Sequence, residues 1–246
     1  MKTFRRIPIA FAILASVMLV FSSASADIFL KQKVHTDAFQ MMGQTKPASD
    51  DISSIWIATD KIRIDNANQT TLIRMDKNVS YVIDHVKKTY FEMPMGGVPK
   101  SGDEDQAMGE AMSSMMGSFK VIVTPTGESK VVGKWNCKKY IQDLQTFMGP
   151  MKAEVWATED IKIDAAQYMK FYTAALSKQS MGQAGNDAIN EFKKIKGVMV
   201  LTTSTTTIMN TTIKSSTELL EYKEGNAPAG HFELPAGYKK TKMMEP

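Results

Sequence analysis

Between residues 27 and 94 the sequence repeats one pattern, a short β-type segment followed by a turn signal. Ile62 and Ile64, for example, alternate with charged residues. Asn, Asp and Lys occupy the links, and Asn and Asp favour tight turns. Because a parallel crossover needs about a dozen residues or more, links this short permit only antiparallel neighbours. The pattern predicts a β-meander that includes the segments 28–36, 61–65, 70–75, 80–85 and 89–93.

Strand patterns resume in the second half of the chain. Thr202–Thr207 is low in complexity, but Thr favours a pleated surface, so this run is interpreted as strand and not as linker. Phe232–Pro235 is expected to add a short edge piece that ends at its proline. The other segments expected to be strands are 119–124, 130–133, 138–144, 153–158, 198–208 and 211–222.

Two or three short helices are expected between the strands. A capping box and acidic residues open the stretch 100–118. Asp164 is expected to cap a second helix, in which Tyr168 and Met169 face inward. Asn186 is expected to cap a third helix that Gly197 stops. The predicted fold class is therefore mainly β (α+β), with one curved antiparallel sheet or incomplete β-barrel whose open side the helices cover.

The first 26 residues have the pattern of a cleavable secretory signal peptide, with Lys2, Arg5 and Arg6 before an apolar run and cleavage expected after Ala26. The apolar run is too short to span a membrane, and no second one follows. Residues 27–246 are expected to form a single domain that works in the periplasm or outside the cell. No cysteine lies near the expected cleavage site, so no lipid anchor is expected.

Charge and cysteine content exclude several classes of function. Three of the 30 Lys and Arg residues belong to the signal peptide, which leaves 27 against 26 acidic residues and no footprint for nucleic acid. Cys137 is the only cysteine, so no intramolecular disulfide can form, and the residue is interpreted as a small buried hydrophobe. No catalytic motif is present, and His35, His85 and His231 lack metal-ligand spacing. We therefore expect no enzyme, no metal site and no cofactor.

The chain resembles a family of secreted bacterial proteins known as domain of unknown function 4412, grouped with LolA/LolB-like proteins. The resemblance implies an incomplete, strongly curved antiparallel barrel with helices over its mouth, as in periplasmic carriers of lipoprotein acyl chains. It implies no assigned activity. The resembling segments are 28–36, Asp60–Asp65, Met75–Asp76, Lys88–Tyr90, Gly133–Tyr140, Val155–Thr158 and Phe232–Tyr238.

Methionine is the compositional outlier, with 19 residues. Within the first expected helix, methionines recur at helical spacing and share one face, and two more precede it. This face either plugs the core or covers a cavity where flexible thioethers accept acyl chains, and Cu(I) capture is a third alternative. The residues expected to line an apolar-ligand site are Trp56, Met93, Met95, Met108, Met112, Met115, Met116 and Trp156.

The two tryptophans lie in similar sequence contexts. Ile55–Asp65 and Val155–Asp164 each read as a Trp-bearing strand, an acidic turn and a second strand, so Trp56 and Trp156 are expected at equivalent inward positions. Core packing is one interpretation of the pair and cavity lining is the other.

The sequence predicts an exported, soluble, non-catalytic binding protein that carries or senses a lipid or lipoprotein acyl chain. The alternatives are a Met-based Cu(I)-binding periplasmic protein and a ligand-free module that docks on an envelope protein or lipoprotein. Neither nucleic acid nor a transmembrane segment after signal cleavage is expected.

Overall fold

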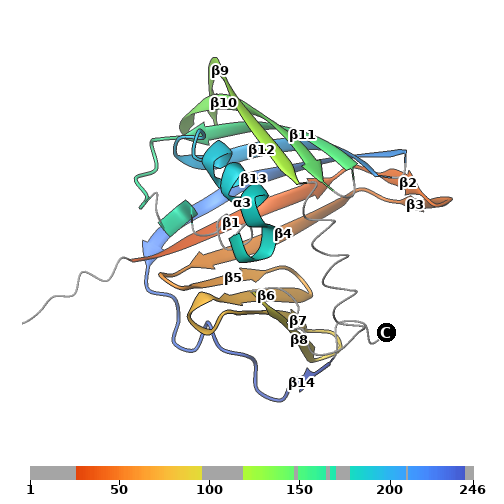
Figure 1. Ribbon diagram of the computed structural model, residues 1–246, viewed down its shortest axis with the longest axis vertical. Coiled ribbons are helices and arrows are strands. Elements are labelled where there is room, and N and C mark those ends of the chain that lie inside the picture. The colour runs from red at the N-terminus through yellow and green to blue at the C-terminus, as the bar shows by residue number, and fades with distance from the viewer. Residues whose placement is uncertain are drawn as a thin grey trace, which may run out of the picture.

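One twelve-stranded sheet runs through the whole molecule and curves strongly from one end to the other (Figure 1). The computed structural model describes residues 26–95, 119–146, 149–164, 167–169, 178–208 and 210–241, and the expected signal peptide and the expected helix at 100–118 lie outside these residues. The first half of the sheet uses β1 (Asp27–Thr36), β4 (Ser49–Ile57), β5 (Lys61–Asp65), β6 (Gln69–Arg74), β7 (Val79–Asp84) and β8 (Thr89–Pro94). The second half uses β9 (Lys120–Val132), β10 (Trp135–Thr146), β11 (Gly149–Thr158), β12 (Val198–Ile208), β13 (Thr211–Gly225) and the short β14 (Lys239–Lys240).

Strand order shows how the two halves join. The order is β14-β8-β7-β6-β5-β4-β1-β13-β12-β11-β10-β9, so β1 lies between two meanders and pairs with both β4 and β13. β9 and β14 remain as free edges, and the sheet does not close into a barrel. A small separate hairpin joins β2 (Phe39–Met41) to β3 (Gln44–Lys46). The expected large antiparallel sheet is confirmed.

Alternation along the strands gives the sheet two different faces. Ile28 and Leu30 of β1 are buried in the main core, with Ile55 and Ile57 of β4 packed beside them. Because successive side chains point to opposite faces, Phe29 and His35 of β1 lie on the other side. We call the side of Ile28 the core face and the side of His35 the open face.

The helix α3 (Lys178–Phe192) covers the far end of the core face. A second core cluster joins its Ala188 and Phe192 and the following Ile195 to Val121, Val123, Tyr140, Val155 and Ala157. Glu191 also accepts a hydrogen bond from the backbone N–H of Val123 at 2.8 Å, which satisfies a donor on the edge strand β9. Among the residues that the structure describes, no helix has the length and apolar character needed to cross a membrane.

The helix expectations are met in part. Asp164 caps as predicted, because its side chain accepts from the Gln167 N–H at 3.1 Å and its carbonyl accepts from the Tyr168 N–H at 2.9 Å. Asn186 is not a cap, since α3 begins eight residues earlier, at Lys178. The first half of α3 is polar and contains glycines, so its apolar periodicity starts late. The helix also ends at Phe192, well before Gly197.

Segments 119–124 and 130–133 are strand as expected, but they belong to one continuous strand, β9, which opposes β10 through a bulge near Lys138. Two other strand expectations were wrong. Residues 161–164 form no strand, because Ile161 turns into the core and Asp164 begins the next helical turn. Residues 232–235 lie outside any strand, and the edge piece is instead β14, which pairs parallel with β8.

Candidate functional site

A groove of about 870 Å³ lies on the open face of the sheet. It crosses β9, β10, β11, β12, β13 and the end of β1. Ile122 lies in this groove, whereas its neighbours Val121 and Val123 point to the opposite face and pack against α3. The lining residues are His35, Asp37, Lys120, Ile122, Asp143, Leu144, Gln145, Pro150, Met151, Lys152, Glu154, Thr203, Ser204, Thr205, Thr207, Lys214, Ser215 and Ser216.

Strand register arranges the groove floor in rows that run across the sheet. One row follows Ile122, Asp143, Lys152, Thr205 and Lys214, each opposite the next on the neighbouring strand. With strands about 4.8 Å apart, the distance from β9 to β1 is about 24 Å. The groove is therefore long enough for an extended ligand that lies across the strands.

The groove is chemically polarised along its length. All six Ser and Thr residues of the lining belong to β12 and β13, and Thr203, Thr205 and Thr207 stand side by side on the open face of β12. The apolar side chains that face the groove come from the other end: Ile122 on β9 and Pro150 on β11. Leu144 and Met151 border the groove but are register partners on the core face, where Leu144 packs against the second core cluster. One end of the groove thus offers hydroxyl groups, and the other offers aliphatic carbon.

The acidic residues of the groove all have cationic partners. Asp143 lies 4.0 Å from the Lys152 ammonium, and Glu154 lies 3.3 Å from that of Lys139. Asp37 contacts the His35 ring at 3.1 Å.

Two lysines of the lining are not compensated in this way. Within the described part of the chain, neither Lys120 nor Lys214 has an ion pair, so the charge left over in the groove is positive.

His35 marks the hydroxyl-rich end of the groove and is held by two carboxylates. Its Nδ1 lies 2.8 Å from an Asp50 oxygen, and its Nε2 lies 3.1 Å from an Asp37 oxygen. The hydrogen bond to Asp50, supported by the one to Asp37, raises the pKa of His35. Only the doubly protonated ring can donate to both carboxylates. The two contacts therefore favour the imidazolium form of His35.

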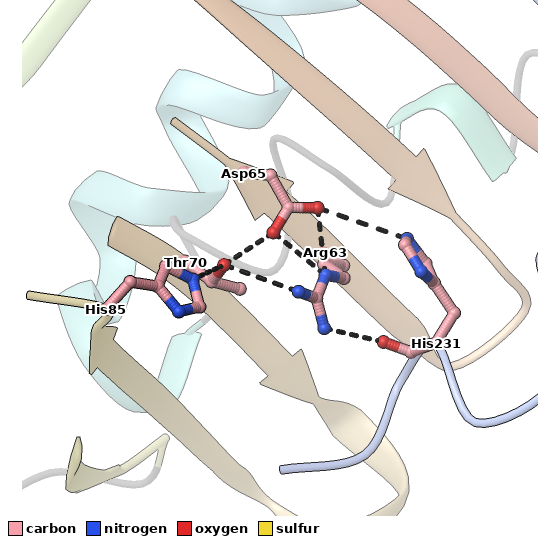
Figure 2. Close-up of polar contacts among 5 residues, drawn as sticks. All are labelled: Arg63, Asp65, Thr70, His85 and His231. Carbon is pink, nitrogen blue, oxygen red and sulfur yellow. Dashed lines mark hydrogen bonds and ion pairs between the residues drawn. The ribbon is translucent and has the colours of Figure 1, made fainter. Parts of the chain in front are cut away.

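A second polar cluster lies on the same face, where the C-terminal segment (residues 226–241) crosses β5, β6 and β7. Figure 2 shows Arg63 between Asp65, Thr70 and His231. The Arg63 guanidinium donates to Asp65 at 2.8 Å and to the His231 carbonyl at 2.8 Å. Thr70 donates to Asp65 and contacts His85 Nε2 at 2.8 Å. Each strand position in this cluster therefore has a partner on a neighbouring strand or on the C-terminal segment.

The same arrangement recurs one strand along. Arg74 donates to Asp76 at 2.7 Å and to the Phe232 carbonyl at 2.9 Å, as Arg63 does with Asp65 and the preceding carbonyl. Two Arg-x-Asp units thus capture consecutive carbonyls of the C-terminal segment. Hydrogen bonding from Arg74, together with its charge, lowers the pKa of Asp76 to about 2. We call these contacts the arginine clamp.

Burial and hydrogen bonding together shift the pKa values of the titratable groups in the clamp. Burial lowers the pKa of His231, and the nearby Arg63 charge acts in the same direction. Burial also acts to raise the pKa of Asp65, but hydrogen bonds from Arg63 and Thr70 outweigh it and hold that pKa below its ordinary value. Thr70 is fully buried, so no substrate can reach its hydroxyl. The clamp therefore fixes the C-terminal segment on the open face.

The structure describes four of the eight residues that the sequence placed in one apolar-ligand site, and none of these four lines the open-face groove. Trp56 contacts Phe29 and, at the edge of the clamp, the ring of His231. Trp156 is 7% exposed in the main core, with the Lys130 ammonium 4.0 Å from its ring centroid. Met93 is half-buried in β8, and Met95 packs against the main core. The remaining expected residues, Met108, Met112, Met115 and Met116, lie outside the described residues.

Comparison with known families places the chain. The model of the family described as "Domain of unknown function (DUF4412)" matches residues 39–238. The chain belongs to this family. The match includes the groove strands β9 to β13 and the residues of the arginine clamp, and it confirms the resemblance seen in the sequence. No curated protein matches the chain.

Two solved structures share a limited likeness with this DUF4412 member. The structure of PNGF-II is 12% identical at a TM-score of 0.35 and is matched over 86% of this chain, which spans only 30% of that protein. A domain from Vibrio parahaemolyticus, described as a "putative outer membrane lipoprotein-sorting protein domain", is 5% identical at a TM-score of 0.34, over 85% of this chain and 89% of that one. At TM-scores this low, neither likeness assigns an activity to the chain.

Proposed function

We propose that the protein is an exported, non-catalytic binding protein that holds an elongated amphiphile, such as a lipid or acyl chain, in the open-face groove. The observation that carries this proposal is the polarised groove itself, with aliphatic residues at one end and hydroxyl groups at the other. Its volume, about 870 Å³, falls in the range of small-molecule sites. The signal-peptide pattern of residues 1–26 supports export.

Simple energetics indicate how such a ligand would bind. Full burial of a twelve-carbon chain contributes roughly 10 kcal/mol, at about 0.8 kcal/mol per methylene. An open groove buries about half of the chain, which leaves about 5 kcal/mol and a dissociation constant in the sub-millimolar range. Contact with the acyl chain alone is therefore weak, and polar contacts must add to it.

The geometry of His35 supports a non-catalytic role. Ser216 lies opposite His35 in the strand register, and Asp50 contacts the His35 ring, so the three residue types of a hydrolase triad are close together. However, His35 Nε2 lies 3.1 Å from an Asp37 oxygen, and this contact competes with any role of that nitrogen as a base toward the Ser216 hydroxyl.

Native mass spectrometry and titration test the proposal together. Protein purified without detergent is expected to carry a small amphiphile, and the delipidated protein should bind a fluorescent fatty acid. Thr205→Trp fills the middle of the groove floor and is expected to weaken probe binding at least tenfold. Thr45→Trp, on the exposed β3 strand, is the matched control and should leave binding unchanged. A protein that ignores every lipid probe, or a Thr205→Trp variant that binds normally, would overturn the proposal.

A further inference from the structure

We infer that the ligand of the open-face groove is an anion, with a carboxylate or phosphate head group on Lys214 and its apolar tail toward β9. The inference rests on the proposed function and adds the ligand's charge and its orientation. It follows from two separate observations, the uncompensated lysine and the one-sided distribution of hydroxyl groups.

Lys214 lies where an anionic head group would gain most. Its register partner is Thr205, and Ser216 follows two residues later on the same face of β13. The two hydroxyl groups and the ammonium can all donate to one anion. Hydrogen bonds to a charged group are about twice as strong as neutral ones, so this cluster favours an anion over a neutral polar head group.

The neighbouring acids do not compete for Lys214. Asp37 contacts His35 through its side chain, and only its backbone N–H reaches Lys214, where it donates to the carbonyl at 3.0 Å. Asp50 is shared between His35 and Lys33, which lies 3.2 Å away. The Lys214 ammonium therefore remains available to a ligand.

The opposite end of the groove is suited to the tail. Ile122 is 44% exposed there, so its side chain offers apolar surface to a ligand in the groove. Pro150, on the open face of β11, adds apolar surface at the same end. Lys120 is the second uncompensated lysine, but it lies at this apolar end, and its long stem can lie along a tail while its ammonium stays in water.

Three ten-carbon ligands with different head groups test the inference on the mature chain. Decanoate, decyl phosphate and the neutral decanol compete, below their aggregation concentrations, against a bound fluorescent probe. We expect the better of the two anions to bind about five- to tenfold more tightly than decanol, with the preference weakened by salt. The tighter anion identifies the head group as carboxylate or phosphate.

Two matched lysine variants locate the head group. Lys214→Gln is expected to abolish the preference for the anion while leaving decanol binding unchanged. Lys120→Gln should keep the preference. Equal binding of anions and decanol, or a preference that survives Lys214→Gln, would overturn the inference and leave the proposed function intact. If none of the three ligands binds, the proposed function itself fails.

Discussion

Gly197 and Gly127 have nearly the same backbone conformation but different surroundings, and this contrast allows a sharp test of the fold. Their φ angles are +84° and +79°, so an L side chain is strained at either position. A Cβ added at Gly127 would have no atom within 4 Å. At Gly197 the same atom would lie 1.9 Å from the backbone oxygen of Thr158. Only Gly197 is therefore constrained by space as well as by conformation.

The expected cost follows from this difference. Left-handed backbone costs a non-glycine residue about 1–2 kcal/mol, which the stiffer unfolded chain offsets in part, so Gly127→Ala should lower the free energy of unfolding by about 1 kcal/mol. Gly197→Ala must also displace Thr158, which is fully buried and donates to the Asn136 carbonyl at 2.8 Å. We expect a total loss of about 3–5 kcal/mol.

Urea denaturation of the two variants and the wild type measures the effect, provided that all three transitions have the same slope. The midpoint of Gly197→Ala should fall well below that of Gly127→Ala. Equal midpoints would show that β11 and the chain entering β12 can separate freely, and would refute the close packing on which the argument depends.

Three further predictions concern the clamp and the cysteine. Arg74→Met is expected to lower the free energy of unfolding by about 2–3 kcal/mol, because it leaves the Phe232 carbonyl and Asp76 without their donor; urea denaturation measures this, and an unchanged midpoint would contradict it. The folded-state pKa of His231 lies below the usual 6.5, so its contribution to stability is present above pH 6.5 and lost as pH falls; His231→Asn should flatten the fall in urea midpoint between about pH 7 and pH 5, and an unchanged slope would count against it. Cys137 is 1% exposed and burial raises its thiol pKa, so alkylation should be slow in the native protein and fast in urea; rapid native labelling would show that the site opens.

The meander could be predicted because its information is local. Each of β5 to β8 carries its own alternation and its own turn residues, and neighbours in sequence are neighbours in space. β12 was predicted for the same reason, although its Thr run is low in complexity. The central pairing of β1 with β13 could not be predicted from the sequence, because residues about 180 positions apart meet there, as His35 does with Ser216.

The predicted strands that do not form lie where tertiary contacts override the local sequence pattern. Residues 161–163 alternate like a strand, yet Asp160 accepts from the Asn136 N–H at 2.8 Å and Ile161 turns into the core, so the chain leaves the sheet. The C-terminal segment contains apolar residues of strand type, but Arg63 and Arg74 bind its carbonyls and prevent a ladder.

The candidate groove could not be derived from the sequence for a related reason. Its lining is spread over six strands whose order depends on the non-local pairing of β1 with β13. The sequence-based site consisted of Trp and Met residues, whereas the groove is lined mainly by polar residues that come together on one face of the sheet. Only the Thr run gave a local signal, as alternate hydroxyl groups on one strand.

The position of the groove follows from which half of the open face is covered by another segment of the chain. Over β5 to β7 the C-terminal segment covers this face, and Leu72 and Ile83 are buried there. Over β9 to β13 no described segment covers it, and the strands instead present Thr203, Thr205 and Thr207. Threonine keeps the β-branched shape that favours strands, while its hydroxyl stays hydrated, so an empty groove is stable and does not expose a large apolar patch. A sheet built to be filled by another protein element would carry Val or Ile at these positions, as β5 does with Ile62 on the core face. The choice of threonine therefore favours a surface that is alternately wet and occupied, which is what reversible binding of an amphiphile requires.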